Sequence, residues 1–217
     1  MPSPDLPRLH AVTDSATLDS SEFVRRAISI MEAAGARLAL HLRGPASSGR
    51  SLYEMAMALG PAARSTGALL VANDRVDVAL AAGLGGAHLG ERSLAVRDVR
   101  ALLGPDRLIG ASVHDEAALR TALDDGANYA FVGNVYETMS HPGRAGLGEG
   151  GLARIVEHVP GLAVIAIGGL TPDRVGEARR AGAFGVAVLR GVWSAGDPAA
   201  AVLDYLAALE RPSTESP

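Results

Sequence analysis

Short apolar runs and amphipathic helical segments alternate eight times along this chain. The runs predicted to be strands are residues 9–13, 38–42, 68–72, 87–89, 108–113, 128–135, 162–167 and 186–189. Strands that are each followed by a helix belong to a parallel sheet, and eight such units within 217 residues close into a barrel. The sequence therefore predicts an α/β fold, a single-domain (β/α)8 TIM barrel. An open doubly wound sheet is the alternative, and it is disfavoured because no G-x-G-x-x-G turn follows the first run.

We expect the barrel to span residues 9–209, between an N-terminal tail of residues 1–8 and a polar C-terminal tail of residues 210–217. The net charge of the chain is −4, which does not indicate a basic surface for binding nucleic acid. No apolar run approaches the roughly 20 residues of a membrane span, and the N-terminus lacks a signal-peptide core. These features predict a cytoplasmic protein without nucleic-acid or membrane partners. The oligomeric state stays open, a homodimer included.

Two residue types that carry much enzyme chemistry are missing. The chain has no cysteine, which excludes disulfides, cysteine-ligated zinc and thiol nucleophiles. All 20 basic residues are arginines, so Schiff-base chemistry with a lysine amine is excluded as well. Neither an H-E-x-x-H motif nor a Ser-His-Asp arrangement with familiar spacing is present, which leaves metalloprotease and serine-hydrolase functions without support.

Glycine follows the last two predicted strands. Gly168 and Gly169 come after the seventh strand, and Arg190 and Gly191 come after the eighth. In (β/α)8 barrels the loops after these two strands commonly bind phosphate, because backbone N–H groups there attract an anion. We therefore predict a phosphate site at these residues, although glycines that only form tight turns would give the same pattern.

Polar residues also follow the other predicted strands, at the barrel end where active sites lie. They are Arg43 after the second strand, Asn73 and Asp74 after the third, Glu91 and Ser93 after the fourth, Ser112 and His114 after the fifth, and Asn134, Glu137, Thr138, Ser140 and His141 after the sixth. Arg43 is suited to grip a carboxylate or phosphate, or to form a structural ion pair. Asp74 either ligates Mg²⁺ or caps the next helix, and a lone carboxylate makes a poor magnesium site.

His114 is the candidate acid–base residue. An imidazole titrates near neutrality, so it can accept and deliver a proton within one turnover. The alternative is that His114 caps the fifth helix. His88 falls inside a predicted strand, where it either packs in the core or faces the site, whereas His10 and His158 fit surface or core roles.

Seven motifs in a fixed order resemble the thiamine phosphate synthase and TenI superfamily over about residues 9–193. They are LHAVTD, NDRVDVAL, GAHLG, ASVHDEAA, YAFVGNVYET, VIAIGGLTPDRV and GVAVLRGV. The resemblance implies a TIM barrel that acts in thiamine biosynthesis and binds a thiazole phosphate.

The synthase branch of this superfamily couples a pyrimidine diphosphate with a thiazole phosphate. Its pattern implies Mg²⁺ between two aspartates and lysines near the diphosphate. Here residues 41–45 read HLRGP in place of Gln-Leu-Arg-Glu-Lys, residues 138–141 read TMSH in place of Thr-x-Thr-Lys, and Ser93 takes the place of the second aspartate. Of the charged residues in this pattern, only Arg43 and Asp74 match. Without Mg²⁺ or lysine, a departing diphosphate loses its main electrostatic stabilisation.

The sequence therefore favours the other branch, the TenI-type thiazole tautomerase, an isomerase that aromatises the thiazole carboxylate phosphate by moving a proton from ring carbon to ring nitrogen. The resemblance implies that His114 is catalytic and that no metal or cofactor is needed. It also implies that Gly168, Gly169, Leu189 and Arg190 bind the phosphate of the substrate and that Arg43 faces its carboxylate. The other predicted substrate-binding residues are Asn73, Ser112, Asn134, Glu137 and Thr138.

Two alternatives remain at this point. One is thiamine phosphate synthase activity, with Mg²⁺ and a diphosphate site rebuilt from Arg43, Arg50 and His141. The other is a non-catalytic regulator that binds thiazole phosphate.

Overall fold

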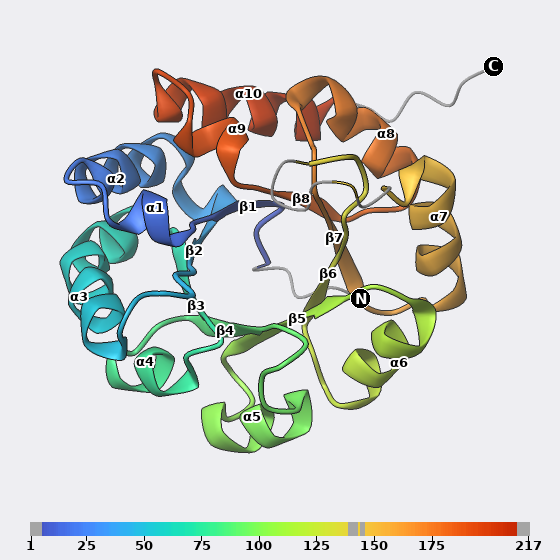
Figure 1. The fold of residues 1–217 in the computed structure, drawn as a ribbon, viewed down its shortest axis with the longest axis horizontal. Helices are drawn as coiled ribbons and strands as arrows, with labels where there is room; N and C mark the ends of the chain where they lie inside the picture. Colours follow the sequence, from blue (N-terminus) through green and yellow to red (C-terminus); the bar gives the residue numbers. More distant parts are fainter. Residues whose placement is uncertain (1–5, 139–142, 144–145, 212–217) are drawn as a thin grey trace.

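Eight parallel strands pair in sequence order, and β8 pairs back with β1 to close a barrel (Figure 1). The computed structural model describes residues 6–138, 143 and 146–211. The strands are β1 Leu9–Val12, β2 Leu38–Leu42, β3 Leu69–Asn73, β4 Gly86–Leu89, β5 Leu108–Val113, β6 Tyr129–Gly133, β7 Ala163–Ile167 and β8 Gly185–Val188. The predicted (β/α)8 barrel is confirmed, and the strand ends differ from the prediction by two residues at most.

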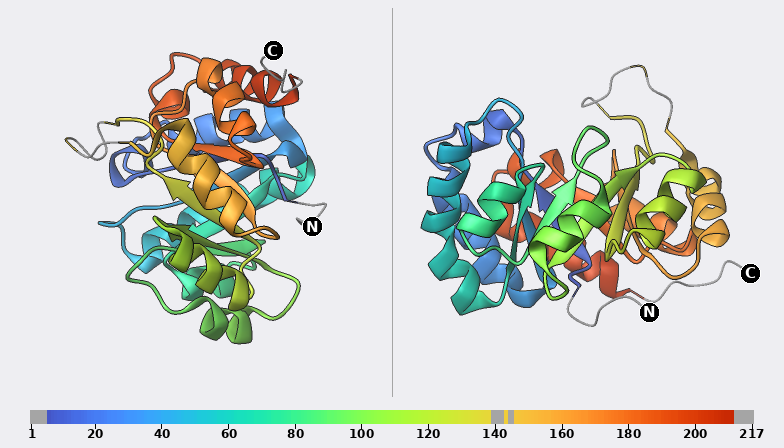
Figure 2. Two further views of the ribbon diagram at one scale, coloured as in Figure 1. Left: turned by 90° about the vertical axis from the view of Figure 1, so that its right-hand side faces the viewer. Right: turned by 90° about the horizontal axis from the view of Figure 1, so that it is seen from below.

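Helices surround the barrel on all sides (Figures 1 and 2). They are α1 Ser15–Leu18, α2 Phe23–Ala34, α3 Gly49–Thr66, α4 Val76–Ala81, α5 Val96–Leu103, α6 Glu116–Asp124, α7 Gly148–His158, α8 Val175–Arg180, α9 Arg190–Trp193 and α10 Pro198–Glu210, with 3-10 turns η1 Gly35–Arg37 and η2 Pro172–Arg174. Among the described residues, no helix combines the length and apolar character that a membrane span requires.

The short helices α1 and α9 were not predicted. Each has four residues, too few for a 3.6-residue apolar period to show in the sequence. Asp14 caps α1 by accepting a hydrogen bond from the backbone N–H of Thr17, and α9 begins directly after β8. Both helices therefore lie at the carboxyl ends of strands, where the predicted site residues gather.

The barrel interior is filled mainly by rings. Tyr129 and Phe131 of β6 pack there against His10, His41 and His88 from β1, β2 and β4, and the ring centres of His88 and Phe131 are 4.0 Å apart. All five side chains are buried. The barrel centre is thus a packed core and not an open channel.

Burial controls the charge of the three interior histidines. It lowers the pKa of His10 and of His88 well below the ordinary value, and lowers the pKa of His41 to about 4. All three are therefore neutral at pH 7 in the folded protein. His88 and His10 belong to the core, whereas His158 lies on the surface, where its Nδ1 donates a hydrogen bond to the carbonyl of Arg154.

Residues 6–8, which the sequence assigned to the tail, pack against the barrel. Leu6 is buried in the core cluster that includes Tyr129. The carbonyl of Arg8 accepts a hydrogen bond from the backbone N–H of Val186, and the Arg8 side chain donates to the carbonyl of Phe184. This segment therefore joins β1 to β8 ahead of the first strand.

Candidate active site at the carboxyl end of the barrel

The loop after β7 needs glycine for two separate reasons. Gly168 and Gly169 have φ angles of +100° and +65°, which other residues rarely adopt. A Cβ atom on Gly168 would also lie 2.5 Å from the Cβ of Asn134, and one on Gly169 would lie 2.6 Å from the carbonyl oxygen of Glu137. The loops after β6 and β7 are therefore in backbone contact, and their approach leaves room for no side chain.

The loop after β8 enters α9 directly. Leu189 is its N-cap residue, and within the described residues the N–H groups of Arg190 and Gly191 have no hydrogen-bond acceptor. The N–H of Gly169 likewise has none in that part of the chain. These groups can donate to an anion, as predicted for the phosphate site. Occupation by a phosphate stays a prediction.

Tyr205 of α10 braces both of these loops, which the sequence did not indicate. Its hydroxyl donates to the carbonyl of Leu170, 2.9 Å away. A Cβ on Gly191 would lie 2.1 Å from the same hydroxyl oxygen. The sequence gives little indication of this role, because a buried tyrosine on a terminal helix usually only fills space in the core.

We expect Gly191→Ala to destabilise the protein by about 1–3 kcal/mol, because its methyl group would push against the Tyr205 hydroxyl. Tyr205→Phe removes that oxygen, so the double variant should lose less stability than the two single variants together. Urea unfolding of the four proteins measures the coupling. Strictly additive losses would show that the two residues do not contact each other.

Arg43 places a positive charge at the barrel mouth. Its backbone is anchored to Thr13: the N–H of Arg43 donates to the Thr13 hydroxyl, which donates to the Arg43 carbonyl. Its half-buried guanidinium has no hydrogen-bond or ion-pair partner in the described part of the chain. The structural ion pair considered from the sequence is therefore not found there. A partly buried arginine without a partner among the described residues is suited to bind an anion.

Asp74 ties the end of β3 to the loop after β4. Its Oδ1 accepts hydrogen bonds from the N–H of Gly90, 2.8 Å away, and from the hydroxyl of Ser93. The alternative that Asp74 caps the next helix is wrong, because the N-terminus of α4 has no side-chain cap. Asp74 adopts a φ of +61°, which is uncommon for a residue other than glycine.

The residues at this end of the barrel do not fit a two-carboxylate Mg²⁺ site. Ser93 donates a hydrogen bond to Asp74 at the position where a second carboxylate would be needed. No group of three histidine, aspartate or glutamate side chains is arranged to hold a metal within the described residues. One carboxylate with an occupied oxygen is a poor ligand set for an octahedral cation.

His114 lies at the rim of the mouth, with both ring nitrogens engaged. Its Nδ1 is 2.6 Å from the carbonyl of Gly133, and its Nε2 is 3.1 Å from a carboxylate oxygen of Glu91. The alternative that His114 caps the fifth helix is wrong, because Asp115 caps α6 by accepting from the N–H of Ala118. A carbonyl only accepts, so Nδ1 carries the proton.

The remaining predicted residues divide between the barrel interior and the rim. Asn73 bonds to His41, and the Ser112 hydroxyl lies 2.9 Å from Nε2 of His88. At the rim, Asn134 donates to the carbonyl of Tyr136, Arg190 donates to the Thr138 hydroxyl, and Glu137 is exposed. Arg50 lies on the exposed face of α3, paired with Glu54. Ser140 and His141 lie outside the described residues.

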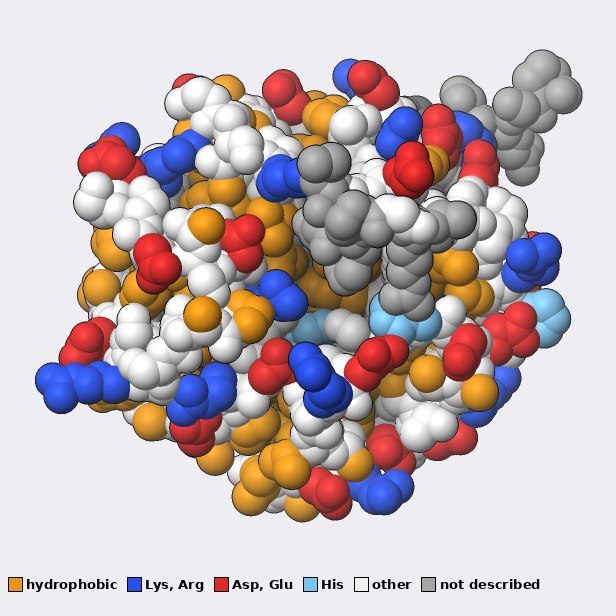
Figure 3. All heavy atoms as spheres, viewed as in Figure 1, with side chains coloured by type: hydrophobic (Ala, Val, Ile, Leu, Met, Phe, Trp, Pro, Cys, Tyr) orange, Lys and Arg blue, Asp and Glu red, His pale blue; other side chains and the backbone are white. Residues whose placement is uncertain are grey.

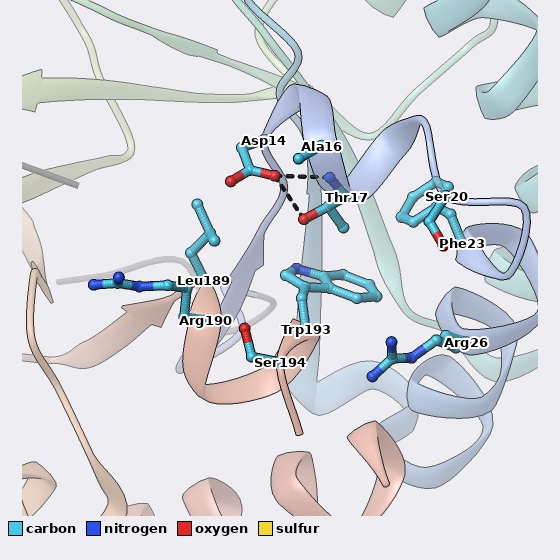
Figure 4. Close-up of a pocket in the computed structure, with 10 residues that line it drawn as sticks. All are labelled: Asp14, Ala16, Thr17, Ser20, Phe23, Arg26, Leu189, Arg190, Trp193 and Ser194. Carbon is cyan, nitrogen blue, oxygen red and sulfur yellow. Dashed lines mark hydrogen bonds between the residues drawn. The ribbon is translucent and has the colours of Figure 1, made fainter. Parts of the chain in front are cut away.

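A pocket of about 300 Å³ lies beside the loop after β8, between α1, α2 and α9 (Figure 4). It is lined by Asp14, Ala16, Thr17, Ser20, Phe23, Arg26, Leu189, Arg190, Trp193 and Ser194. The Arg190 side chain points away from Trp193 and Arg26. Seen down the barrel, arginine and acidic side chains surround a recessed centre where histidine is visible (Figure 3).

Comparisons with known proteins agree with one another. A family model described as thiamine monophosphate synthase matches residues 9–192. The thiamine-phosphate synthase of Salinispora arenicola is 37% identical over 207 residues, which cover 94% of this chain and 98% of that protein. The thiamine phosphate pyrophosphorylase of Pyrococcus furiosus superposes with a TM-score of 0.79 at 30% identity, covering 94% of this chain and 95% of the other.

A longer relative shares part of its length with this chain. The thiamine biosynthesis bifunctional protein ThiM/ThiE of Symbiobacterium thermophilum is 43% identical over 162 residues, which cover 75% of this chain. The match spans only 34% of that protein, about a third of its length.

The expectation of a thiazole tautomerase is wrong. Relatives that are 37% to 39% identical to this chain are named thiamine-phosphate synthase, which favours the transferase alternative. The prediction of a tautomerase was based on the lysines and the second aspartate that this sequence lacks. It could not show that Arg43 stands without an ion-pair partner in the described part of the mouth.

Proposed function

Since the chain belongs to the thiamine monophosphate synthase family of thiamine-biosynthesis enzymes, we propose that it is a transferase that couples thiazole phosphate with hydroxymethylpyrimidine diphosphate. The observation that carries the proposal is the presence of two places for anions at one barrel mouth. The loops after β7 and β8 offer free N–H groups, and Arg43 offers an unpaired guanidinium within the described residues. Two phosphorylated substrates need two such places.

The coupling itself makes modest demands on acid–base groups. The ring nitrogen of the thiazole attacks the methylene carbon of the pyrimidine, a C–N bond forms, and the C–O bond to the diphosphate breaks. Pyrophosphate leaves with the electron pair, and no proton is gained or lost at the nitrogen. The protein therefore contributes by orienting the two rings and by stabilising the charge on the leaving group.

Arginine has to provide that stabilisation in this chain. The sequence contains no lysine, and the residues around Asp74 do not fit a two-carboxylate metal site. Arg43 meets the leaving diphosphate, and a guanidinium can bind its oxygens through two parallel hydrogen bonds. The phosphomonoester of the thiazole binds at Gly169, Arg190 and Gly191.

The direct test supplies the purified chain with both substrates. We expect thiamine phosphate and pyrophosphate to form in equal amounts, measured by chromatography and by a coupled pyrophosphatase assay. Neither product should form when one substrate is omitted. Binding of both substrates without any product would contradict the transferase proposal and support the non-catalytic alternative.

A second prediction concerns magnesium. We expect pyrophosphate to bind the wild-type protein with similar affinity in Mg²⁺ and in EDTA, because Ser93 gives Asp74 a hydrogen bond in place of a second carboxylate. In Ser93→Asp two carboxylates repel the anion, so binding in EDTA should weaken roughly tenfold and return with Mg²⁺.

Ser93→Asn is the matched control, since it has the size of aspartate without its charge. It should bind pyrophosphate equally with and without Mg²⁺ in calorimetric titrations. A strong requirement for Mg²⁺ in the wild-type protein would show that this interpretation of the Asp74 site is wrong.

A further inference from the structure

One arginine side chain bridges the loops that follow β6 and β7. Arg174 ends the 3-10 turn η2, which is closed by a hydrogen bond of 3.0 Å from its N–H to the carbonyl of Thr171. The guanidinium lies over the ring of Tyr136, with Cζ 4.5 Å from the ring centre, and Nη1 donates to the carbonyl of Gly169, 3.1 Å away. One planar group thus contacts an aromatic face and the backbone of the glycine loop at the same time.

Tyr136 provides a fixed platform for this guanidinium. Its ring packs half-buried against the core, and its hydroxyl donates a hydrogen bond to a carboxylate oxygen of Glu177 in α8. Burial and the hydrogen bond to Glu177 raise the pKa of Tyr136, so the hydroxyl keeps its proton and remains the donor. A Cβ on Gly169 would lie 2.8 Å from the Cβ of Tyr136. The ring is therefore held by α8 on one side and by the glycine loop on the other.

Two carbonyl contacts fix the peptide planes of the glycine loop. The carbonyl of Gly168 accepts from the N–H of Tyr136, 3.1 Å away, and the carbonyl of Gly169 accepts from Arg174. In a trans peptide the N–H points opposite to the carbonyl, so the N–H groups of Gly169 and Leu170 are directed away from these two contacts. Neither N–H has an acceptor within the described residues. The loop thus presents two donors whose direction depends on Tyr136 and Arg174.

We propose that Arg174 is a positioning residue for an anion bound by the loop after β7: stacked on Tyr136, it holds the peptide between Gly169 and Leu170 so that its N–H donates to a phosphate oxygen. A loop whose peptide planes were free would have to order them on binding, and the lost conformational entropy would weaken the affinity. That the anion is the phosphate of the thiazole rests on the proposed function, whereas the orientation of the peptide does not.

Inorganic phosphate is the probe for this loop, titrated into the full chain labelled with 15N. We expect the amide signals of Gly169 and Leu170 in the wild-type protein to shift as phosphate binds. In Arg174→Gln the dissociation constant should rise about fivefold, because the peptide has lost the contact that orients it. If neither amide of the wild-type protein responds to phosphate, the proposal is overturned.

Two further variants separate positioning from charge. Arg174→Lys keeps the charge but loses the planar group that stacks on Tyr136, so it should bind phosphate nearly as weakly as Arg174→Gln. Arg180→Gln is the matched control, because it removes the same charge from the end of α8, where Arg180 pairs with Glu149 on the surface. Its affinity should stay within about twofold of the wild type. Full affinity in Arg174→Lys, or equal weakening in Arg180→Gln, would show an effect of charge alone and contradict the proposal.

Variants at Tyr136 test the platform. Tyr136→Phe keeps the ring and should keep the phosphate affinity within about twofold, whereas Tyr136→Leu removes the face that supports Arg174 and should weaken binding as much as Arg174→Gln. Since both losses act through one contact, the double variant should bind no more weakly than either single variant. Additive losses would mean that the two side chains act separately. If Tyr136→Leu does not fold, the variants of the exposed Arg174 still decide the outcome.

Steady-state kinetics distinguish this role from a merely structural one. Arg174→Gln should raise the KM for thiazole phosphate about fivefold and leave the KM for the pyrimidine diphosphate unchanged, since only one substrate meets this loop. Equal changes in both KM values would contradict the proposal. If the wild-type protein forms no product, the proposed function fails, and the phosphate titration still decides the role of Arg174.

Discussion

Arg43→Gln is expected to lower kcat/KM for thiamine phosphate formation by about 10²–10³, because it removes a preorganised donor for the leaving diphosphate. The expected loss is specific to activity. Arg43 has no ion pair within the described residues, so its replacement should change the free energy of unfolding by no more than about 0.5 kcal/mol. Steady-state kinetics and urea unfolding of the same preparation measure the two effects.

Two further arginine variants sharpen this prediction. Arg43→Lys keeps the charge but loses the paired N–H groups, so it should recover only part of the activity. Arg50→Gln is the matched control, because Arg50 is paired with Glu54 on the surface of α3. Equal losses of kcat/KM in Arg43→Gln and Arg50→Gln would contradict the prediction. They would show that the total charge near the mouth matters and that Arg43 makes no specific contact with the substrate.

The fold could be predicted because its signal repeats. Each apolar run is short, bounded by glycine or polar residues, and followed by a helical period, so eight units support one another. The apolar pattern alone does not locate the start of α3, which is Gly49. Ser48 caps this helix by accepting from the N–H of Ser51, within a polar stretch that the apolar pattern does not cover. One-turn helices such as α9 are too short to show a helical period of apolar residues in the sequence.

The positions of site residues could be predicted better than their partners. A residue that follows a strand must lie at the mouth, so Arg43 and Asp74 were placed correctly. Their contacts depend on residues far away in the chain, such as Ser93, whose hydroxyl engages Asp74 across two neighbouring loops. The choice between reactions failed for the same reason. Missing residues show which contacts are lost, but they do not show which contacts the remaining side chains make.

Mild acid is expected to unfold this protein through its interior histidines. In the unfolded chain a histidine has a pKa near 6.5, whereas burial keeps the pKa of His10 and His88 well below that value and that of His41 at about 4. Above pH 6.5 both states are neutral and nothing changes. Below it the unfolded chain binds protons that the folded protein does not, so stability falls with pH until the folded pKa values are reached.

The expected size of this effect is large. At pH 5 each buried histidine costs about 2 kcal/mol relative to pH 7.5, and the three together cost about 6 kcal/mol, comparable to the whole stability of many domains. Urea unfolding at pH 7.5, 6 and 5 measures the loss.

His88→Gln should reduce the pH dependence by about one third, since it removes one of the three buried imidazoles. His158→Gln should leave it unchanged, because that side chain is 59% exposed. A loss below about 1 kcal/mol by pH 5 would mean that the interior imidazoles take up protons without unfolding, which would require water or a counter-charge inside the barrel.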